Sequence, residues 1–350
     1  MTNLTLGGRS IGDGQPCFVI AEAGSNHNGN LDGASHLIDI AADAGADAVK
    51  FQVFRAERLY PRTAGRSDYL QASRSIYDIV AELEMPLEWL PALTARCRRR
   101  GIQFLASAFD EASVDALAAF VTGYKIASYE MTHYPLLRHV LSKGKPVIIS
   151  TGAADLDEVR EMVGEVSALD NGGFALMQCT AAYPAPLDSL NVRAIATMKR
   201  AFGVPVGLSD HSRDPLVGPM AAVAVGANLI EKHFTSSNLL PGPDHKFAIE
   251  PEELAHLVRG IRDVEQALGS GEKVVQSVEA ELRRFARRSV FTTRPVAAGE
   301  TFTPENVAVL RCGKLQPGVE PRCYPGVLGR RATRSIGPEQ PVQQDDYVER

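Results

Sequence analysis

The feature that most constrains the fold is a repeat of short apolar runs, each followed by a longer segment with helical spacing. Eight such runs are rich in β-branched and aromatic residues, which favour strands. Short continuous apolar runs are typical of strands that are buried on both faces, as in a parallel sheet. The predicted strands cover residues 18–24, 48–54, 102–107, 123–128, 146–151, 174–180, 205–210 and 229–234.

The segments between these runs predict helices, several of which begin at Asp, Ser or Pro and end just before Gly. They cover residues 31–44, 86–100, 111–120, 155–169 and 215–225, with a closing helix over 251–268. Eight strands alternating with helices predict an α/β fold of the TIM (β/α)8 barrel type, preceded by a small N-terminal hairpin. An open doubly wound sheet is the alternative, but it more often shows a G-x-G-x-x-G motif after its first strand, and none is present here.

The pattern changes near residue 270. From Ser289 onward, short strand-like runs are separated by Pro and Gly turns, which predicts a separate small β-rich domain. We therefore expect a catalytic barrel over residues 1–268, a linker over 269–288 and the small domain over 289–350. The connection from Arg55 to Met85 is longer than an ordinary βα loop and predicts a lid or a partner contact.

Composition excludes several classes of protein. A net charge of −5 provides no overall positive field to hold nucleic acid or an anionic membrane. No apolar stretch is long enough to span a bilayer and the N-terminus lacks a signal-peptide pattern, so we expect a cytoplasmic protein. The five cysteines are scattered and form no C-x-x-C pair, which predicts reduced thiols and no cysteine zinc site.

Polar residues occur at nearly every predicted strand end, where the active site of a TIM barrel lies. They are Glu22, Lys50, Gln52, Ser107, Lys125, Ser128, Glu130, Gln178, Thr180, Ser209, His211, Glu231 and His233. Lysines supply point charge and hydroxyls supply directed donors, so the lysines and serines predict a phosphate pocket. Lys125 and Ser128 have opposite parity along their strand, so both reach the site only if the strand ends or bulges between them.

Two histidines are the sharpest chemical signal. His211 and His233 lie at the ends of consecutive predicted strands, which are neighbours in a closed barrel, so their imidazoles could share one divalent cation. Two nitrogens with open, oxygen-filled positions suit Mn2+, with Mg2+, Co2+ or Zn2+ as alternatives. His27, in a Gly- and Asn-rich loop that follows Glu22, is a weaker candidate.

Seven motifs in one order carry a resemblance to a known family. They are E-A-G-S-N-H-N-G (22–29), K-F-Q (50–52), Y-K-I-A-S-Y-E (124–130), C-T-A-A-Y-P (179–184), G-L-S-D-H-S (207–212), E-K-H-F (231–234) and P-G-P-D-H (241–245). With these motifs the chain resembles the bacterial sialic acid synthase family over almost its whole length. The resemblance implies a phosphoenolpyruvate-using barrel followed by an antifreeze-like (SAF) domain, in a domain-swapped homodimer.

The resemblance also implies a role for each matching residue. Glu22 and Glu130 are the acid/base candidates, with His27 as a further catalytic candidate, and His211 and His233 hold a divalent metal, most simply Mn2+, with Mg2+ or Co2+ as alternatives. Phosphoenolpyruvate is bound by Lys50, Lys125, Ser107, Ser128 and Ser209. The sugar is bound by Gln52, Tyr183, Asp244 and, from the neighbouring subunit, Arg311.

Two departures from the family pattern leave the acceptor sugar open. Cys312 replaces a proline, and Ala181 stands where N-acetylneuraminate synthases often carry Asn. The expected reaction condenses phosphoenolpyruvate and water with either N-acetylmannosamine or a 2,4-diacetamido-trideoxyhexose, giving a nine-carbon sialic-type acid and phosphate. The rival enzyme class is an aldolase acting on a related keto acid, either metal-dependent or a Schiff-base enzyme using Lys50 or Lys232. The rival outside catalysis is a carbohydrate-binding protein on a decayed barrel.

Overall fold

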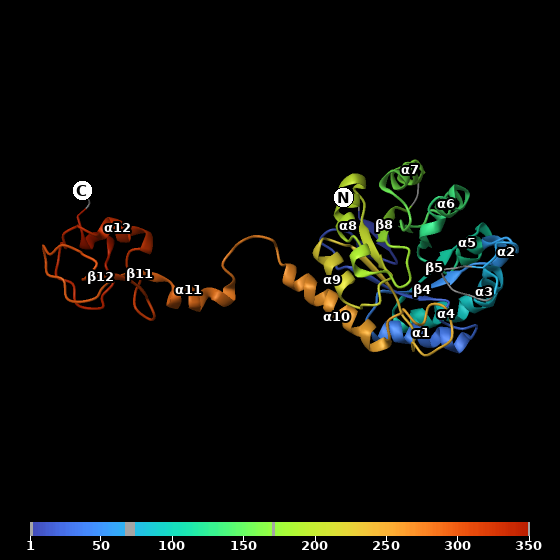
Figure 1. The fold of residues 1–350 in the computed structure, drawn as a ribbon, viewed down its shortest axis with the longest axis horizontal. Helices are drawn as coiled ribbons and strands as arrows, with labels where there is room; N and C mark the ends of the chain where they lie inside the picture. The colour runs from blue at the N-terminus through green and yellow to red at the C-terminus, as the bar shows by residue number, and fades with distance from the viewer. Residues whose placement is uncertain (1–2, 67–73, 170–171, 349–350) are drawn as a thin grey trace. The chain divides into compact units, whose positions relative to one another are not determined.

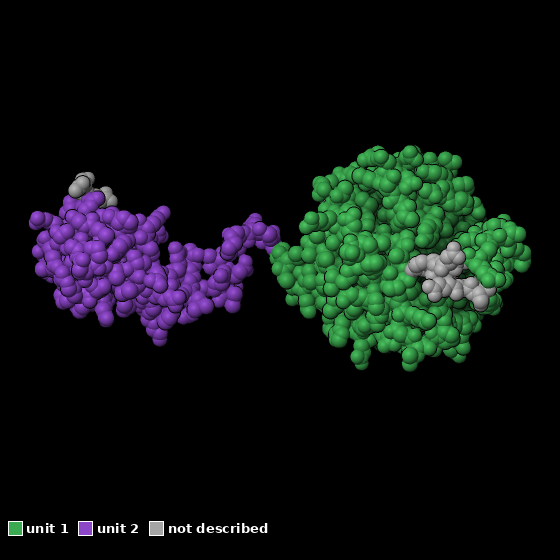
Figure 2. Space-filling view, viewed as in Figure 1, with its two compact units in different colours: residues 1–269 green, residues 270–350 purple. Residues whose placement is uncertain are grey.

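The protein consists of two compact units, residues 1–269 and residues 270–350 (Figure 2). The computed structural model describes residues 3–66, 74–169 and 172–348. Among the described residues, no helix is both long enough and apolar enough to cross a membrane. All five cysteines are free thiols, as predicted.

The first unit is a closed barrel of eight parallel strands, which confirms the predicted TIM barrel and excludes the doubly wound sheet (Figure 1). The strands are β3 (Phe18–Gly24), β4 (Ala48–Val53), β5 (Gln103–Ala108), β6 (Tyr124–Ile126), β7 (Val147–Ser150), β8 (Phe174–Cys179), β9 (Val206–Asp210) and β10 (Leu229–His233). Pairing of β10 with both β9 and β3 closes the ring.

Helices surround the barrel and alternate with its strands (Figure 1). They are α1 (Leu31–Asp43), α4 (Leu90–Arg100), α5 (Glu111–Leu117), α6 (Tyr134–Leu141), α7 (Leu156–Ser167), α8 (Arg193–Phe202), α9 (Val217–Ala224) and α10 (Pro251–Leu268). Two predicted Asp start signals act as caps, since the side chains of Asp110 and Asp155 accept hydrogen bonds from backbone amides of the first turn, and Asn30 caps α1 in the same way. Gly101 ends α4 in the left-handed conformation that glycine adopts without strain.

The long connection between β4 and α4 is partly helical. It contains α2 (Ala56–Leu59), α3 (Ile76–Glu82) and a 3₁₀ turn over Leu87–Trp89. That turn occupies the start of the segment predicted as one helix over residues 86–100. Residues 67–73 of the predicted lid or partner contact lie outside the described residues.

The N-terminal hairpin closes the end of the barrel where the strands begin. It consists of β1 (Leu4–Leu6) and β2 (Arg9–Ile11), and its side chains Leu4, Leu6 and Ile11 are buried. They pack in one cluster with inward-facing strand residues such as Phe18 and Leu105. Because this apolar plug fills the lower part of the barrel, polar groups inside the barrel gather at the opposite end.

The second unit has its own small core. An antiparallel pair, β11 (Arg288–Thr292) and β12 (Val307–Arg311), and isolated bridges enclose Val290, Phe302 and Val327. It also contains α11 (Ala280–Ala286), within the segment predicted as a linker, and α12 (Tyr324–Val327). The predicted small β-rich domain is thus present.

Candidate active site

A layer of charged side chains lies inside the barrel at the carboxyl ends of its strands. The register places Glu22 on β3 opposite Lys50 on β4. Lys50 Nζ lies 2.7 Å from Glu22 Oε2 and 3.8 Å from Glu231 Oε1, and it donates to Ser107 Oγ at 3.0 Å. Lys125 Nζ lies 3.9 Å from the same Glu231 oxygen. Four residues predicted for the site thereby join one buried cluster.

Glu231 is the member of this cluster that sequence reasoning did not select as a site residue. Its carboxylate lies within 4 Å of both lysines and accepts a hydrogen bond from Ser209 Oγ at 3.1 Å. It sits two positions before His233, so both face the interior of the barrel. The parity that Glu231 shares with His233 was the sequence signal that could have identified it as a site residue.

Burial and ion pairing together set the protonation of the cluster. Burial raises the pKa of Glu22 to about 7, although Lys50 opposes this shift. Burial alone would lower the pKa of Lys50, but Glu22 and Glu231 outweigh it and raise that pKa. The pKa of Glu231 is lowered because Lys125 and Lys50 outweigh its burial. The cluster can therefore exchange a proton at Glu22 near neutral pH while Lys50 stays charged.

Hydroxyl groups lie around the two lysines. Ser107 accepts from Lys50, and Ser150, which sequence reasoning did not select, accepts from Lys125 at 2.6 Å. Ser128 Oγ accepts from the backbone amide of Gly152 at 3.0 Å. These positions are consistent with a pocket for an anion, since ammonium and hydroxyl groups of neighbouring strands converge there.

The strand that carries Lys125 ends early, which resolves the parity conflict with Ser128. β6 stops at Ile126, and Ser128–Glu130 forms a 3₁₀ turn. Glu130 on that turn is buried, and its Oε2 finds no hydrogen-bond partner among the described residues. Burial raises the pKa of Glu130 to about 7. A buried carboxylate with a free oxygen and this pKa is suited to accept a proton at neutral pH.

The two predicted metal histidines lie side by side at the end of β9 and β10. The ring centroids of His211 and His233 are 5.4 Å apart. Tyr183 stacks on His211 at 4.1 Å between centroids, and Phe247 packs 5.1 Å from His233. His211 Nδ1 donates to the backbone carbonyl of Thr180 at 2.9 Å, so Nε2 of that ring carries the lone pair.

The histidine pair fits a divalent cation. Burial lowers the pKa of His211 to about 4 and that of His233 well below its usual value, so both rings are neutral, as metal ligation requires. His233 Nδ1 is buried without a hydrogen-bond partner among the described residues. In the same part of the chain, no three His, Cys, Asp or Glu side chains converge as a ligand set. A cation here would take two protein nitrogens and fill its other positions with oxygens of water or substrate.

Gly24 connects the charged cluster to the histidines. It ends β3 with φ +53°, and a Cβ placed there would lie 3.1 Å from Asp244 Oδ2, 3.6 Å from Glu22 Oε1 and 3.9 Å from His233 Cε1. Gln52 donates to the same Glu22 oxygen at 3.1 Å. The predicted sugar residues Gln52 and Asp244 thus line the same space as Glu22 and His233.

Two predicted site residues are not brought into this space by any contact among the described residues. His27 turns toward the outer face of the barrel, where it packs against Trp89 (5.4 Å) and Phe51 (6.4 Å). These contacts give no support to the prediction that His27 acts in catalysis. Arg311 is exposed at the end of β12 in the second unit.

The structure also bears on the Schiff-base alternative, which needs an unprotonated lysine facing the site. Lys232 has the opposite parity to Glu231 and His233, so it points out of the barrel, where Asp210 pairs with it at 2.7 Å. Lys50 faces the site, but its raised pKa keeps it charged. Neither lysine named for that alternative meets the requirement.

Two family profiles match this chain and together cover most of it. The profile of the NeuB family matches residues 37–273, and that of the SAF domain matches residues 287–348. The second match agrees with the small antiparallel sheet of the second unit.

Relatives match over most or all of the chain. The N,N'-diacetyllegionaminic acid synthase of Legionella pneumophila is 40% identical, over 93% of each chain. The crystal structure of the spore coat polysaccharide biosynthesis protein SpsE of Bacillus subtilis is 40% identical over 100% of both chains, with a TM-score of 0.68. The N-acetylneuraminic acid synthetase of Leptospira borgpetersenii, crystallised with citrate, is 35% identical over 81% of this chain and 95% of its own, with a TM-score of 0.73.

Proposed function

Because the chain belongs to the NeuB family of sialic acid synthase-type enzymes, we propose that it condenses phosphoenolpyruvate, water and an N-acetylated amino sugar aldehyde. The products are a nine-carbon sialic-type acid and phosphate. The observation that carries the proposal is the meeting of Glu22, Lys50 and Lys125 with His211 and His233 at one end of the barrel. The five free thiols suit a reducing cytoplasm.

Phosphoenolpyruvate binds at the lysine side of the site. Lys50 and Lys125 supply positive charge, while Ser107, Ser128 and Ser209 supply hydroxyls. The anion competes with carboxylates that already hold the lysines. Glu22 can give up this role by taking a proton, because burial raises its pKa to about 7. Proton uptake there frees Lys50 for the phosphate or carboxylate of the substrate.

The aldehyde of the open-chain sugar lies at the histidine side, where His211 and His233 would hold the divalent cation. Mn2+ suits two nitrogens and several oxygens, with Mg2+ or Co2+ as alternatives. When bound, the cation would polarise the aldehyde oxygen and stabilise negative charge on it. Tyr183 and Phe247 wall this side with apolar surface, which limits the access of bulk water to the two rings.

The carbon–carbon bond forms between carbon three of phosphoenolpyruvate and the aldehyde carbon. Water then adds to carbon two, and the resulting tetrahedral centre expels phosphate. Glu130 accepts the proton from that water, because its Oε2 lacks a partner among the described residues, whereas Glu22 is held by Lys50 and Gln52. Lys125 lies close enough to favour the anionic form of Glu130 electrostatically.

The acceptor is proposed to be a 2,4-diacetamido-trideoxyhexose rather than N-acetylmannosamine. A relative that is 40% identical to this chain is a diacetyllegionaminic acid synthase. Half-buried Ala181, beside Tyr183, removes a polar amide that N-acetylneuraminate synthases often carry, which leaves room for a second acetamido group. Gln52, Tyr183 and Asp244 are the proposed sugar contacts of the barrel.

Arg311 reaches the sugar from the second subunit of a domain-swapped homodimer in this proposal. Support comes from exposed apolar side chains around α11, since Val278, Leu282 and Phe285 are 86%, 61% and 43% exposed in the single chain. Apolar groups that gather on a short helix are typical of surfaces covered by a partner. Arg311 itself is exposed and free to turn to an anionic or polyhydroxyl ligand.

An acceptor panel tests the proposal. Purified protein with Mn2+ and phosphoenolpyruvate is offered N-acetylmannosamine and each diacetamido hexose, and phosphate release and product mass are followed. Release that depends on a diacetamido hexose and disappears in the Glu130→Gln and His211→Ala variants is expected. Phosphate release without any amino sugar, or none with every sugar, contradicts the proposed reaction.

A subunit mixture tests the swapped arrangement. Arg311→Ala and His211→Ala chains, each inactive alone, are co-expressed with different tags and the heterodimer is isolated. If Arg311 acts in the partner's barrel, one site of the heterodimer has both residues and activity returns. If Arg311 acts within its own chain, both sites lack a residue, and an inactive heterodimer overturns the swap.

A further inference from the structure

A buried ion pair lies directly behind the two histidines. Asp210 on β9 and Lys232 on β10 are paired in register, with a distance of 2.7 Å between Lys232 Nζ and Asp210 Oδ2. Their side chains are 0% and 1% exposed. Each residue directly precedes a histidine of the site, His211 or His233, and the alternation of strand side chains directs the pair outward, toward the helices.

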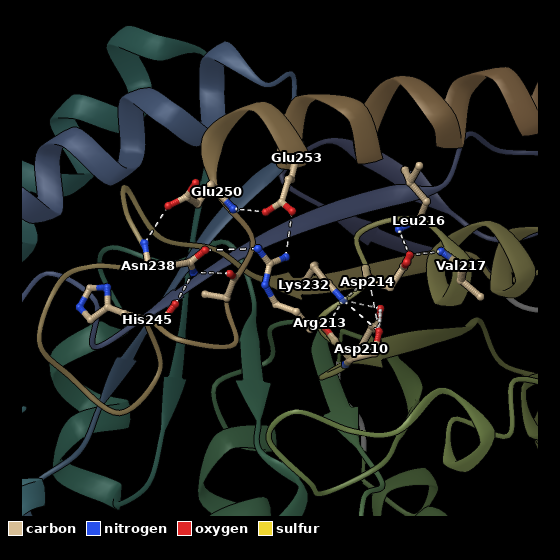
Figure 3. Close-up of polar contacts among 12 residues, drawn as sticks. Asp210, Arg213, Asp214, Leu216, Val217, Lys232, Asn238, His245, Glu250 and Glu253 are labelled. Carbon is tan, nitrogen blue, oxygen red and sulfur yellow. Dashed lines mark hydrogen bonds and ion pairs between the residues drawn. The ribbon is translucent and has the colours of Figure 1, made fainter.

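Lys232 also donates hydrogen bonds to the loop that follows His211 (Figure 3). Its ammonium donates to the backbone carbonyls of Ser212 and Asp214, the latter at 2.8 Å, and to Ser212 Oγ at 3.2 Å. Asp210 Oδ1 accepts from the Ser212 amide at 2.8 Å. The residues on both sides of His211, Asp210 and Ser212, are therefore both bonded to the buried ammonium of Lys232.

The same loop holds the segment that carries Asp244 (Figure 3). Arg213 donates to Glu253 on α10 at 2.9 Å and to Asn238 Oδ1 at 3.2 Å. Asn238 in turn donates through its side-chain amide to the backbone carbonyl of His245, the neighbour of Asp244. These contacts, together with the backbone between them, connect Lys232 with the segment that carries Asp244.

This arrangement is suited to holding the histidines of the site in place. A buried ion pair replaced by apolar residues of similar size often costs no stability, so its burial is not explained by stability alone. Groups that hydrogen-bond to the rings of metal-binding histidines hold those rings in place, and their loss weakens metal affinity by about 10- to 100-fold, which is an upper bound for a group that acts through the backbone. Among the described residues, the contacts of Lys232 are with Asp210, Ser212 and Asp214, so any effect on the site passes through other residues.

We propose that Lys232, paired with Asp210, is a positioning residue that aligns His211 with His233 for a shared divalent cation and, through Arg213, sets the segment that carries Asp244. The inference rests on the proposed function for the identity of the site. It adds that the shape of the site depends on a charge outside the barrel interior.

The test compares the full-length double variant Asp210→Asn/Lys232→Met, which leaves no unpaired charge, with the wild type. Lys199→Met is the matched control, because Lys199 is also a buried lysine paired with an aspartate, Asp13, but near the opposite end of the barrel. Mn2+ affinity is measured by calorimetric titration together with the thermal unfolding midpoint. The double variant is expected to bind Mn2+ more weakly, by at most about 10- to 100-fold, whereas Lys199→Met lowers the midpoint and keeps the affinity.

A second readout does not depend on metal. In protein labelled with 15N-histidine, NMR reports which ring nitrogen of His211 is protonated, and the bond to Thr180 predicts the Nδ1–H form in the wild type and in Lys199→Met. The double variant is expected to lose this single form. If it does not fold, Ser212→Ala, which removes the hydroxyl joining the pair, is measured instead, with a several-fold loss of affinity expected.

The proposal is overturned if the folded double variant keeps the His211 protonation and the Mn2+ affinity of the wild type. It is also overturned if Lys199→Met loses the single protonated form and the Mn2+ affinity to the same extent as the double variant. A wild-type chain that binds no Mn2+ contradicts the proposed metal site, while the NMR comparison still decides the role of Lys232. The contacts made by Arg213 are tested separately. Arg213→Met is expected to raise the KM for the sugar several-fold and leave Mn2+ affinity intact. Arg259→Met, at an exposed arginine of α10, changes neither.

Discussion

Replacing Glu130 by glutamine is expected to make the protein more stable at alkaline pH while removing most of its activity. Glu130 is buried, its Oε2 has no hydrogen-bond partner among the described residues, and burial raises its pKa from an ordinary 4.5 to about 7. Folding therefore works against the charged form that the proposed base must adopt. Glutamine has nearly the same shape and never carries that charge.

The size and the sign of the effect follow from the pKa. Below pH 4.5 the folded and unfolded chains both hold the proton, so the variant and the wild type have similar stability. Between pH 4.5 and 7 the unfolded chain loses its proton first, so the wild type becomes less stable as pH rises. At about 1.4 kcal/mol per pKa unit, the free energy of unfolding of the variant exceeds that of the wild type by about 3 kcal/mol at pH 8.

Urea unfolding at pH 4.5 and pH 8, followed by the fluorescence of the single tryptophan, Trp89, measures this difference. Glu161→Gln, at an exposed glutamate of α7, controls for a general effect of removing a carboxylate and is expected to show no such gap. In the same preparations, kcat of Glu130→Gln is expected to fall by about 10²- to 10⁴-fold. A stability difference that is equal at the two pH values, or a fully active variant, refutes the reasoning.

Three further outcomes are expected. Leu6→Ala, in the apolar plug, should lower the free energy of unfolding by about 3 kcal/mol in urea titrations and leave both KM values unchanged; a changed KM would contradict the separation of plug and site. Gly24→Ala places a methyl group 3.1 Å from Asp244 Oδ2, so steady-state kinetics should show a raised sugar KM, and an unaltered KM would remove Asp244 from the sugar side. Treatment with EDTA should abolish phosphate release and added Mn2+ should restore it, whereas His211→Ala should stay inactive at the same Mn2+ concentration; activity that survives EDTA would exclude a metal role.

The barrel could be predicted because its determinants are local. Buried parallel strands are continuous apolar runs, and helices between them begin at capping residues such as Asn30 and Asp155. The boundaries of the elements were predicted less well. The predicted strand over residues 123–128 ends at Ile126, because the chain turns into a 3₁₀ segment that directs Ser128 and Glu130 to the site.

The site could be predicted only in part, because its chemistry depends on contacts between distant strands. Parity along β10 identifies Glu231 and His233 as facing one way and Lys232 the other, but it does not reveal what each side chain meets. Glu231 becomes significant only when Lys50 and Lys125 arrive from other strands. In the same way, the role of Lys232 depends on a loop that follows a different strand.

His27 shows a different limit of prediction from the sequence, which concerns the direction of a loop. A loop rich in Gly and Asn that follows Glu22 indicates a position near the site but not the direction in which the loop turns. In the structure the loop carries His27 outward, where the ring packs against Trp89, a residue more than sixty positions further along the chain. The apolar partner that decides the direction is invisible in the local sequence.

The most direct test of the central claim is a single-turnover reaction in water enriched in 18O. The mixture contains the protein, phosphoenolpyruvate, a diacetamido hexose and Mn2+, and after quenching the products are analysed by mass spectrometry. The account predicts a product with the mass of the sugar joined to a pyruvate unit, carrying one heavy oxygen, together with unlabelled phosphate. Labelled phosphate and an unlabelled product, or pyruvate released without sugar attached, would contradict it.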